Sequence, residues 1–185
     1  MSRLLPLAFL GASIAHAAPG LKSKDAVWFP TKEGDTRVYE VRVGDKVESS
    51  FKDKVTRVEK KDEGLEVTIA RDGPGANSFV TVISVTREGL FRVSFNGAPL
   101  DKPVPLLKMP AKVGTQWELD GGATYTITKE EEVEVPAGKF PAIRVESVSG
   151  TSKTLLWFAA NVGVVKMQTE GSDRVQVLKE FKAGK

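Results

Sequence analysis

Residues Val133 to Lys166 read V-E-V-P-A-G-K-F-P-A-I-R-V-E-S-V-S-G-T-S-K-T-L-L-W-F-A-A-N-V-G-V-V-K and indicate the fold class. The stretch is rich in apolar residues and divides into short extended segments. Residues typical of tight turns separate them at Pro136-Ala137-Gly138, at Gly150 and at Gly163. We therefore predict that Val133–Lys166 is the central meander of an all-β domain and marks the centre of its sheet.

The same pattern continues outside this stretch. Leu65, Val67 and Ile69 alternate with less apolar residues, as in a half-buried strand. No segment keeps a helical apolar period of about 3.6 residues for three turns. About ten strands, spaced by roughly 8–12 residues, predict a curved antiparallel sheet in the form of a sandwich or a (half-)barrel.

A proline-rich segment divides the chain. Four prolines lie between Gly97 and Gly114. Because proline cannot donate a ladder hydrogen bond, we predict an extended connection here, outside the strands of the core. A single β-domain over residues 27–182 would then have halves at 27–107 and 108–182.

A short repeat raises the possibility that the two halves are similar. Pro30–Gly34 and Pro110–Gly114 share the pattern P-x-K-x-G at an offset of 80 residues, and each precedes a run of strands. Three shared residues are weak evidence, so internal duplication and coincidence both remain open.

The N-terminus has the features of a signal peptide. Arg3 precedes an apolar run, and Ala15-His16-Ala17 is a small-x-small cleavage pattern. We predict a signal peptide over residues 1–17, then a disordered stretch over 18–26. Because the chain has no cysteine to carry a lipid, we expect an exported, periplasmic or extracellular protein with neither a lipid anchor nor an integral membrane segment after cleavage.

The composition excludes several classes of function. The chain has no cysteine, and its one histidine, His16, lies in the predicted signal peptide. A Ser-His-Asp triad, a cysteine nucleophile and a zinc site with the usual ligands are therefore excluded from the mature chain. The net charge of +3 gives no nucleic-acid footprint. We predict no cofactor, no metal site and no catalytic residue.

Carboxylates remain as possible catalysts. Glu130, Glu131 and Glu132 are consecutive, so in a strand they alternate between faces, and we interpret them as a charged sheet edge. A glycosidase-like pair of acids can come from distant parts of a chain. A carboxylate-dependent hydrolase therefore stays an alternative.

Aromatic residues are the candidates for ligand binding. Trp28, Trp117, Tyr125 and Trp157 lie at strand positions. Such residues either line a ligand cavity or pack in the core. We select Trp117, Tyr125 and Trp157 as candidate ligand-binding residues.

Three motifs give the chain a resemblance. They are Pro110-x-x-x-Gly114-x-x-Trp117, V-P-A-G-x-F-x-A-x-x-V over 135–145, and W-x-A-x-x-V-G-x-V-K over 157–166. With these motifs the second half resembles a family of exported bacterial β-rich domains of unknown function. The resemblance implies a curved antiparallel sheet and no established enzymatic activity. One departure is Ala160-Asn161, where the family often has proline and glycine.

Together these observations favour an uncharacterised, noncatalytic exported β-domain. We expect it to bind an apolar small molecule or a partner protein of the cell envelope. The alternative is a structural or interaction module without a ligand.

Overall fold

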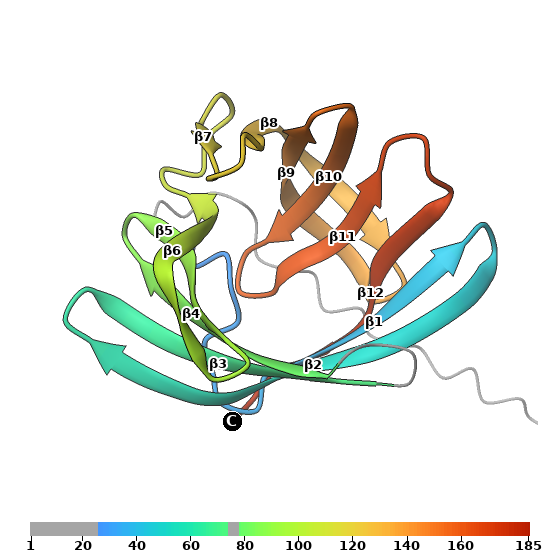
Figure 1. Ribbon diagram of the computed structural model, residues 1–185. Coiled ribbons are helices and arrows are strands. Elements are labelled where there is room, and N and C mark those ends of the chain that lie inside the picture. The colour runs from blue at the N-terminus through green and yellow to red at the C-terminus, as the bar shows by residue number, and fades with distance from the viewer. Residues whose placement is uncertain (1–25, 74–77) are drawn as a thin grey trace, which may run out of the picture.

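The structure is a computed structural model that describes residues 26–73 and 78–185. The predicted signal peptide and all of the predicted disordered stretch except Ala26 lie outside these residues. Twelve strands form one sheet (Figure 1). Their bounds are β1 Thr36–Val43, β2 Lys46–Lys61, β3 Gly64–Asp72, β4 Phe79–Thr86, β5 Gly89–Phe95, β6 Ala98–Lys108, β7 Gln116–Glu118, β8 Thr124–Val135, β9 Gly138–Ser149, β10 Ser152–Ala159, β11 Gly163–Thr169 and β12 Arg174–Lys182.

The first and last strands meet in the middle of the sheet. The strand order is β6-β5-β4-β3-β2-β1-β12-β11-β10-β9-β8-β7, and every neighbouring pair is antiparallel. The prediction that Val133–Lys166 marks the centre of the sheet is therefore wrong. That stretch lies toward the β7 edge. Because β1 pairs with β12 in the middle of the sheet, the strands from the middle of the sequence lie toward its edges.

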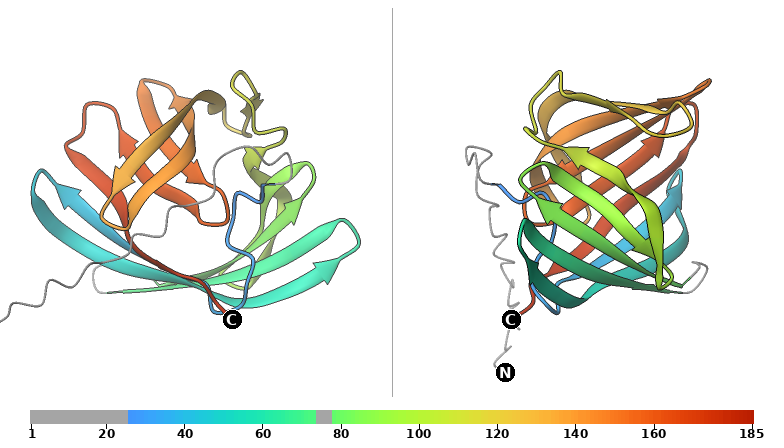
Figure 2. Two further views of the ribbon diagram at one scale, coloured as in Figure 1. Left: turned by 180° about the vertical axis from the view of Figure 1, so that it is seen from behind. Right: turned by 60° about the vertical axis from the view of Figure 1, so that its left-hand side comes forward.

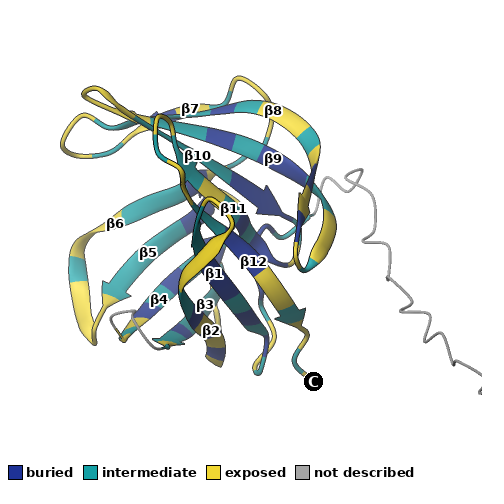
Figure 3. Ribbon diagram, turned by 90° about the vertical axis from the view of Figure 1, so that its right-hand side faces the viewer, coloured by how far each residue is buried: buried dark blue, intermediate teal, exposed yellow. Residues whose placement is uncertain are grey.

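The predicted fold class is confirmed. The sheet curls into a half-barrel, and its two edge strands, β6 and β7, face an open seam (Figures 1 and 2). The alternation seen in the sequence becomes alternation of burial. In β3, for example, Val67 and Ile69 are buried while Thr68 between them is half-buried (Figure 3).

The proline-rich segment is a strand, contrary to our prediction. Residues 98–108 form β6, which pairs with β5 and is an edge of the sheet. An edge strand tolerates proline because one side needs no ladder donors. Leu107, near the C-terminal end of β6, is fully buried. This strand therefore contributes to the core.

The two halves share a pair of backbone hydrogen bonds between the segment before their first strand and their second strand. The amide of Gly34 donates to the carbonyl of Val55 at 2.9 Å, and 80 residues later Gly114 donates to Ile127 at 2.8 Å. Both glycines have positive φ, +87° and +92°. The return bonds run from Val55 N to Asp35 O at 2.8 Å and from Ile127 N to Thr115 O at 2.9 Å.

The register of the strands repeats as well. The β2–β3 pairing slips between Val55 and Arg57, and the β8–β9 pairing slips between Ile127 and Lys129. Each half is thus a six-stranded meander with a bulge at the same place. Together with the shared P-x-K-x-G, this pattern supports internal duplication over coincidence.

Two hydrophobic cores fill the molecule. The large core joins strands β2–β10 to the segment before β1: Trp28, Phe29, Val55, Val67, Ile69, Ile83, Val85, Leu90, Leu107, Trp117, Ile127, Ile143, Val145 and Phe158. The small core lies among β1, β2 and β8–β12: Tyr39, Phe51, Val133, Val135, Ala142, Trp157, Ala159, Val162, Val165, Val177 and Leu178. Strand β10 serves both, because Phe158 and Trp157 point to opposite faces.

Candidate ligand-binding groove

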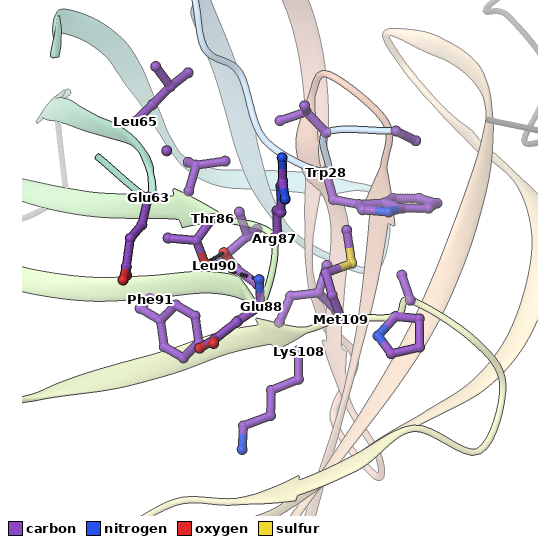
Figure 4. A pocket seen from close by; sticks show the side chains of 18 of the residues that line it. Trp28, Glu63, Leu65, Thr86, Arg87, Glu88, Leu90, Phe91, Lys108 and Met109 are labelled. Atoms are coloured by element: carbon purple, nitrogen blue, oxygen red, sulfur yellow. Dashed lines mark hydrogen bonds between the residues drawn. The ribbon is translucent and has the colours of Figure 1, made fainter. Parts of the chain in front are cut away.

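A groove opens at the end of the large core where the β2–β3 and β4–β5 turns lie. Its volume is about 1890 Å³. The floor is apolar and comes from segments far apart in the sequence (Figure 4). It consists of Trp28, Leu65, Val85, Leu90, Leu107 and Met109.

Trp28 reaches the groove because the segment before β1 is fixed across the open side of the half-barrel. The amide of Asn161 donates to the carbonyl of Val27 at 2.6 Å. Trp28 and Phe29 are then buried in the large core, and the segment crosses between the two halves (Figure 2, left). One wall of the groove is therefore the N-terminal segment itself.

The rim of the groove is charged and of mixed sign. Lys61 is held by Glu59 and Glu66, each at 3.3 Å, and hydrogen bonds to these two carboxylates raise its pKa. The other ionisable residues at the groove add four cations and four anions. These are Lys60, Arg87, Lys108 and Lys112, and Asp62, Glu63, Glu88 and Glu130.

The hairpins beyond the shared bulge differ between the two halves. Counted from the shared bulge, Lys61 at the end of β2 occupies the position of Val133 in β8. Strand β8 continues two residues further from the bulge, over 129–135 against 57–61. Its hairpin reaches β12, where the amide of Ala137 donates to Leu178 O at 3.1 Å. The β8–β9 hairpin thus covers part of the small core, whereas the shorter β2–β3 hairpin ends in charged residues at the groove.

The structure separates the three predicted ligand-binding residues. Trp117 and Tyr125 stack, with ring centroids 5.4 Å apart and planes at 16°. Trp157 lies in the small core, where its Nε1 donates to Glu131 at 2.9 Å and Lys166 lies 4.9 Å from the ring. None of the three lines the groove, so their role in binding stays a prediction. Trp28, the fourth of the aromatic residues named from the sequence, does line it.

The glutamate run differs from a simple charged edge. Glu131 is 22% exposed and contacts Lys129, Arg144 and Trp157. Hydrogen bonds from Lys129 and Trp157, with the charges of Lys129 and Arg144, lower its pKa despite burial. Glu131 therefore fixes the Trp157 ring.

A buried row of charges was not predicted from the sequence. Arg37, Asp53 and Arg71 lie side by side on β1, β2 and β3. Asp53 Oδ2 is 3.4 Å from Arg37, and Arg71 binds both carboxylate oxygens at 2.7 and 2.9 Å. The Arg71 guanidinium also lies 3.9 Å from the Phe51 ring centroid. Charged residues in an alternating strand are normally solvated, so the pattern gives no signal for this row.

Other classes of site receive no support from the described residues. Within 26–73 and 78–185, no group of three or more His, Cys, Asp or Glu side chains is placed to hold a metal ion. In the same ranges no helix is long and apolar enough to cross a membrane.

Comparison with known proteins shows the fold. No protein-family model and no curated protein matches the chain. Two crystal structures do. One is a protein from Bacteroides fragilis described as exported, with a YmcC-like fold, at 16% identity and a TM-score of 0.63. The other is a protein from Parabacteroides distasonis described as a lipoprotein, at 17% identity and a TM-score of 0.58.

Each alignment covers 85% of this chain and 99% of the other. The description of the second neighbour as a lipoprotein runs against our expectation of a chain without an anchor. The description of the first agrees with the exported, β-rich class that the motifs indicate. The chain thus has the fold of these two proteins, a curved β-sheet found in a protein described as exported.

Proposed function

We propose that the protein is a noncatalytic, exported β-domain that holds a lipid-like amphiphile in the groove. The observation that carries this proposal is the apolar floor beneath a charged rim. Binding sites for small molecules are concave and mostly apolar, with a few polar groups at their margins. The domain, over residues 27–182, acts in the periplasm or outside the cell.

The dimensions and charges of the groove favour a chain-like ligand with a zwitterionic head. The groove, at about 1890 Å³, exceeds the roughly 300–1,000 Å³ of ordinary ligand pockets. An alkyl chain on Trp28, Leu65 and Met109 would bury apolar surface, at roughly 25 cal/mol per Å². Cations and anions are nearly balanced on the rim, which suits a head that carries both signs.

The pKa shifts of three glutamates argue against one catalytic role, that of a general acid. Three buried or half-buried glutamates, Glu40, Glu131 and Glu146, have a lowered pKa because cations and hydrogen-bond donors contact them. A general acid needs the opposite, a carboxyl group that keeps its proton near neutral pH. A carboxylate-dependent hydrolase is therefore the less favoured alternative.

Titration with dodecylphosphocholine below its micellar concentration tests the proposal. We expect the indole N–H resonance of Trp28 to shift with saturation, while that of Trp157 stays in place. Met109→Glu puts a charge into the groove and should abolish the shift. Met167→Glu is the matched control, because Met167 is exposed on β11 and does not line the groove.

Absence of a saturable Trp28 shift in the native chain would overturn the ligand proposal. In that case the alternative of a structural or interaction module without a ligand would replace it. Equal loss in both methionine variants would show that the groove is not the binding site.

A further inference from the structure

Strand β8 has a stretch of edge that no other described strand covers. The short strand β7 pairs with it over residues 124–126, and β9 pairs with its other side along its whole length. The last backbone contacts on the β7 side are made by Ile127, whose amide donates to Thr115 O at 2.9 Å and whose carbonyl accepts from Gly114 N at 2.8 Å. Beyond the bulge, β8 continues to Val135 without a neighbour on this side.

The register shows which backbone groups lie on this free side. Val135 is opposite Gly138, across the two-residue loop of the β8–β9 hairpin. The residues that flank such a loop exchange both hydrogen bonds, and bonded and non-bonded pairs alternate along an antiparallel ladder. The amides and carbonyls of Glu130, Glu132 and Glu134 therefore point away from β9. Within residues 26–73 and 78–185, no backbone hydrogen bond reaches these three residues from that side.

The first half shows how such an edge can be capped. There the amide of Val58 donates to Oε1 of Glu33 at 3.0 Å. Counted from the shared bulge, Val58 corresponds to Glu130, and within the two copies of P-x-K-x-G, Glu33 corresponds to Val113. A valine side chain cannot accept a hydrogen bond, and Val113 is 57% exposed. The second half thus lacks the cap and presents an exposed apolar side chain in its place.

We propose that residues 130–134, the β8 free edge, bind an extended, lysine-rich segment of a partner protein as an added strand. In strand addition the main-chain hydrogen bonds give affinity and alternate side chains give specificity. The side chains of Glu130, Glu132 and Glu134 are all exposed. Their one close cation among the described residues is Lys139, 3.9 Å from Glu132 and from Glu134. Lysines at alternate positions of the added strand would complete the pairing of these carboxylates.

The charges favour such a partner over a second copy of this chain. Two β8 free edges paired with each other would bring glutamates opposite glutamates, and like charges opposite each other destabilise a pair of strands. Each Glu–Lys pair should instead strengthen binding by roughly 1.5- to 5-fold. Glu130 also lies at the rim of the groove, whereas Glu132 and Glu134 do not line it. The strand site therefore does not depend on the proposed amphiphile site.

Two peptides of equal length and pattern are the probes, added to the full chain at constant ionic strength. They are acetyl-KTKVKTK-amide and acetyl-ETEVETE-amide. Hydrogen exchange of the backbone amides of Glu132 and Glu134, followed by NMR, reports on the ladder itself. We expect the basic peptide to slow this exchange with saturation, because the amides become hydrogen-bonded. We expect the acidic peptide, which has the same main chain, to leave it unchanged.

Two substitutions at Glu132 separate the main chain from the charge. Glu132→Pro removes a donor of the free edge, a place where a strand tolerates proline, and should weaken binding of the basic peptide by roughly 10-fold or more. Glu132→Gln keeps the donor and should weaken binding by at most about 5-fold. Glu63→Gln, at an exposed carboxylate of the β2–β3 turn, should have no effect. An indole resonance of Trp157 at its native position would show that each variant is folded, because Glu131 of β8 accepts its N–H.

Three results would overturn the proposal. The first is exchange that the basic peptide does not slow, or that the acidic peptide slows equally. The second is full affinity in Glu132→Pro, or an equal loss in Glu63→Gln. The third is slow exchange of both amides without any peptide, which would mean that a second copy or the residues before Ala26 already occupy the edge. The Trp28 response to dodecylphosphocholine is a separate readout, so failure of the groove proposal and failure of the strand site are distinguishable.

Discussion

Thr56 and Thr128 make the same hydrogen bond in the two halves of the chain. Thr56 Oγ1 donates to the carbonyl of Thr68, and Thr128 Oγ1 donates to that of Arg144, both at 3.4 Å. Each threonine is the extra residue of its bulge. A bulge bends its strand and increases the local twist. The two halves therefore share a bend, and they differ in the length and charge of the hairpin beyond it.

The β8–β9 hairpin should be more sensitive to a buried charge than the β2–β3 hairpin is to an added valine. Val133→Lys puts an ammonium group into the small core and should destabilise the fold by at least about 2 kcal/mol, the burial of one valine or more. Lys61→Val, at the equivalent exposed position, should change stability by less than about 0.5 kcal/mol. Urea unfolding followed by tryptophan fluorescence measures both. Similar losses in the two variants would contradict the difference in burial between the two positions.

Asp53 should be a main contributor to stability among the charged residues. Asp53→Ala leaves the buried Arg37 without its anion, and breaking a buried pair in this way costs roughly 3–5 kcal/mol. Asp120 serves as the control, since its side chain is 89% exposed and pairs with Lys102 at 3.4 Å. Asp120→Ala should cost less than about 1 kcal/mol. Chemical denaturation of both variants would test this, and an Asp53→Ala variant as stable as the native chain would refute it.

Gly163 is required by its neighbours as well as by its backbone. Its φ is +87°, and a Cβ there would lie 2.7 Å from Nη1 of Arg37. The glycine thus makes room for a buried arginine, a role that its place in a predicted turn does not indicate. We expect Gly163→Ala to cost about 2–4 kcal/mol. Gly150→Ala, at φ +56° with open space around it, should cost about 1–2 kcal/mol. Thermal unfolding of the two variants should show this difference, and equal losses would leave backbone strain as the sole cause.

Glu40 should contribute to loss of stability in acid. It is buried and contacts Lys179 and Arg42, each at 2.7 Å. Hydrogen bonds from Lys179 and then Arg42 lower its pKa from 4.5. Its stabilisation is therefore present above pH 4.5 and disappears as the pH falls through the lower, folded-state pKa.

Glu40→Gln should destabilise the fold by about 1–3 kcal/mol at pH 7, and the difference from the native chain should shrink toward pH 3. Urea titrations at several pH values measure it, with Glu48→Gln, at a half-exposed pair with Arg174, as the control. A difference that is constant with pH would rule out the ionised carboxylate as its source.

The sequence was sufficient for the fold class because strand alternation is a local signal. It was insufficient for the strand order, because pairing of β1 with β12 depends on residues at opposite ends of the chain. The prolines of β6 indicated a non-core segment, yet an edge strand accommodates them. Local patterns report propensity, whereas position in the sheet decides burial.

The candidate sites depended still more on distant contacts. The stack of Trp117 on Tyr125 follows from a short hairpin, and both residues were selected from the sequence. The groove, in contrast, joins Trp28 to turns about 35 and 60 residues away, which no local pattern predicts.

The pairing of β1 with β12 also constrains how the chain can be assembled. Thr36 lies opposite Lys182, whereas the other strand pairs join consecutive segments. During synthesis or transport, each meander can form from local contacts as it emerges. The two cannot be joined until the final strand is present, and until then β1 and β11 expose unpaired edges that can recruit other chains. A chain that stops short of Arg174 is therefore expected to be prone to aggregation, even though it lacks only the two pairings that β12 makes. We expect its survival to require chaperones that shield these edges.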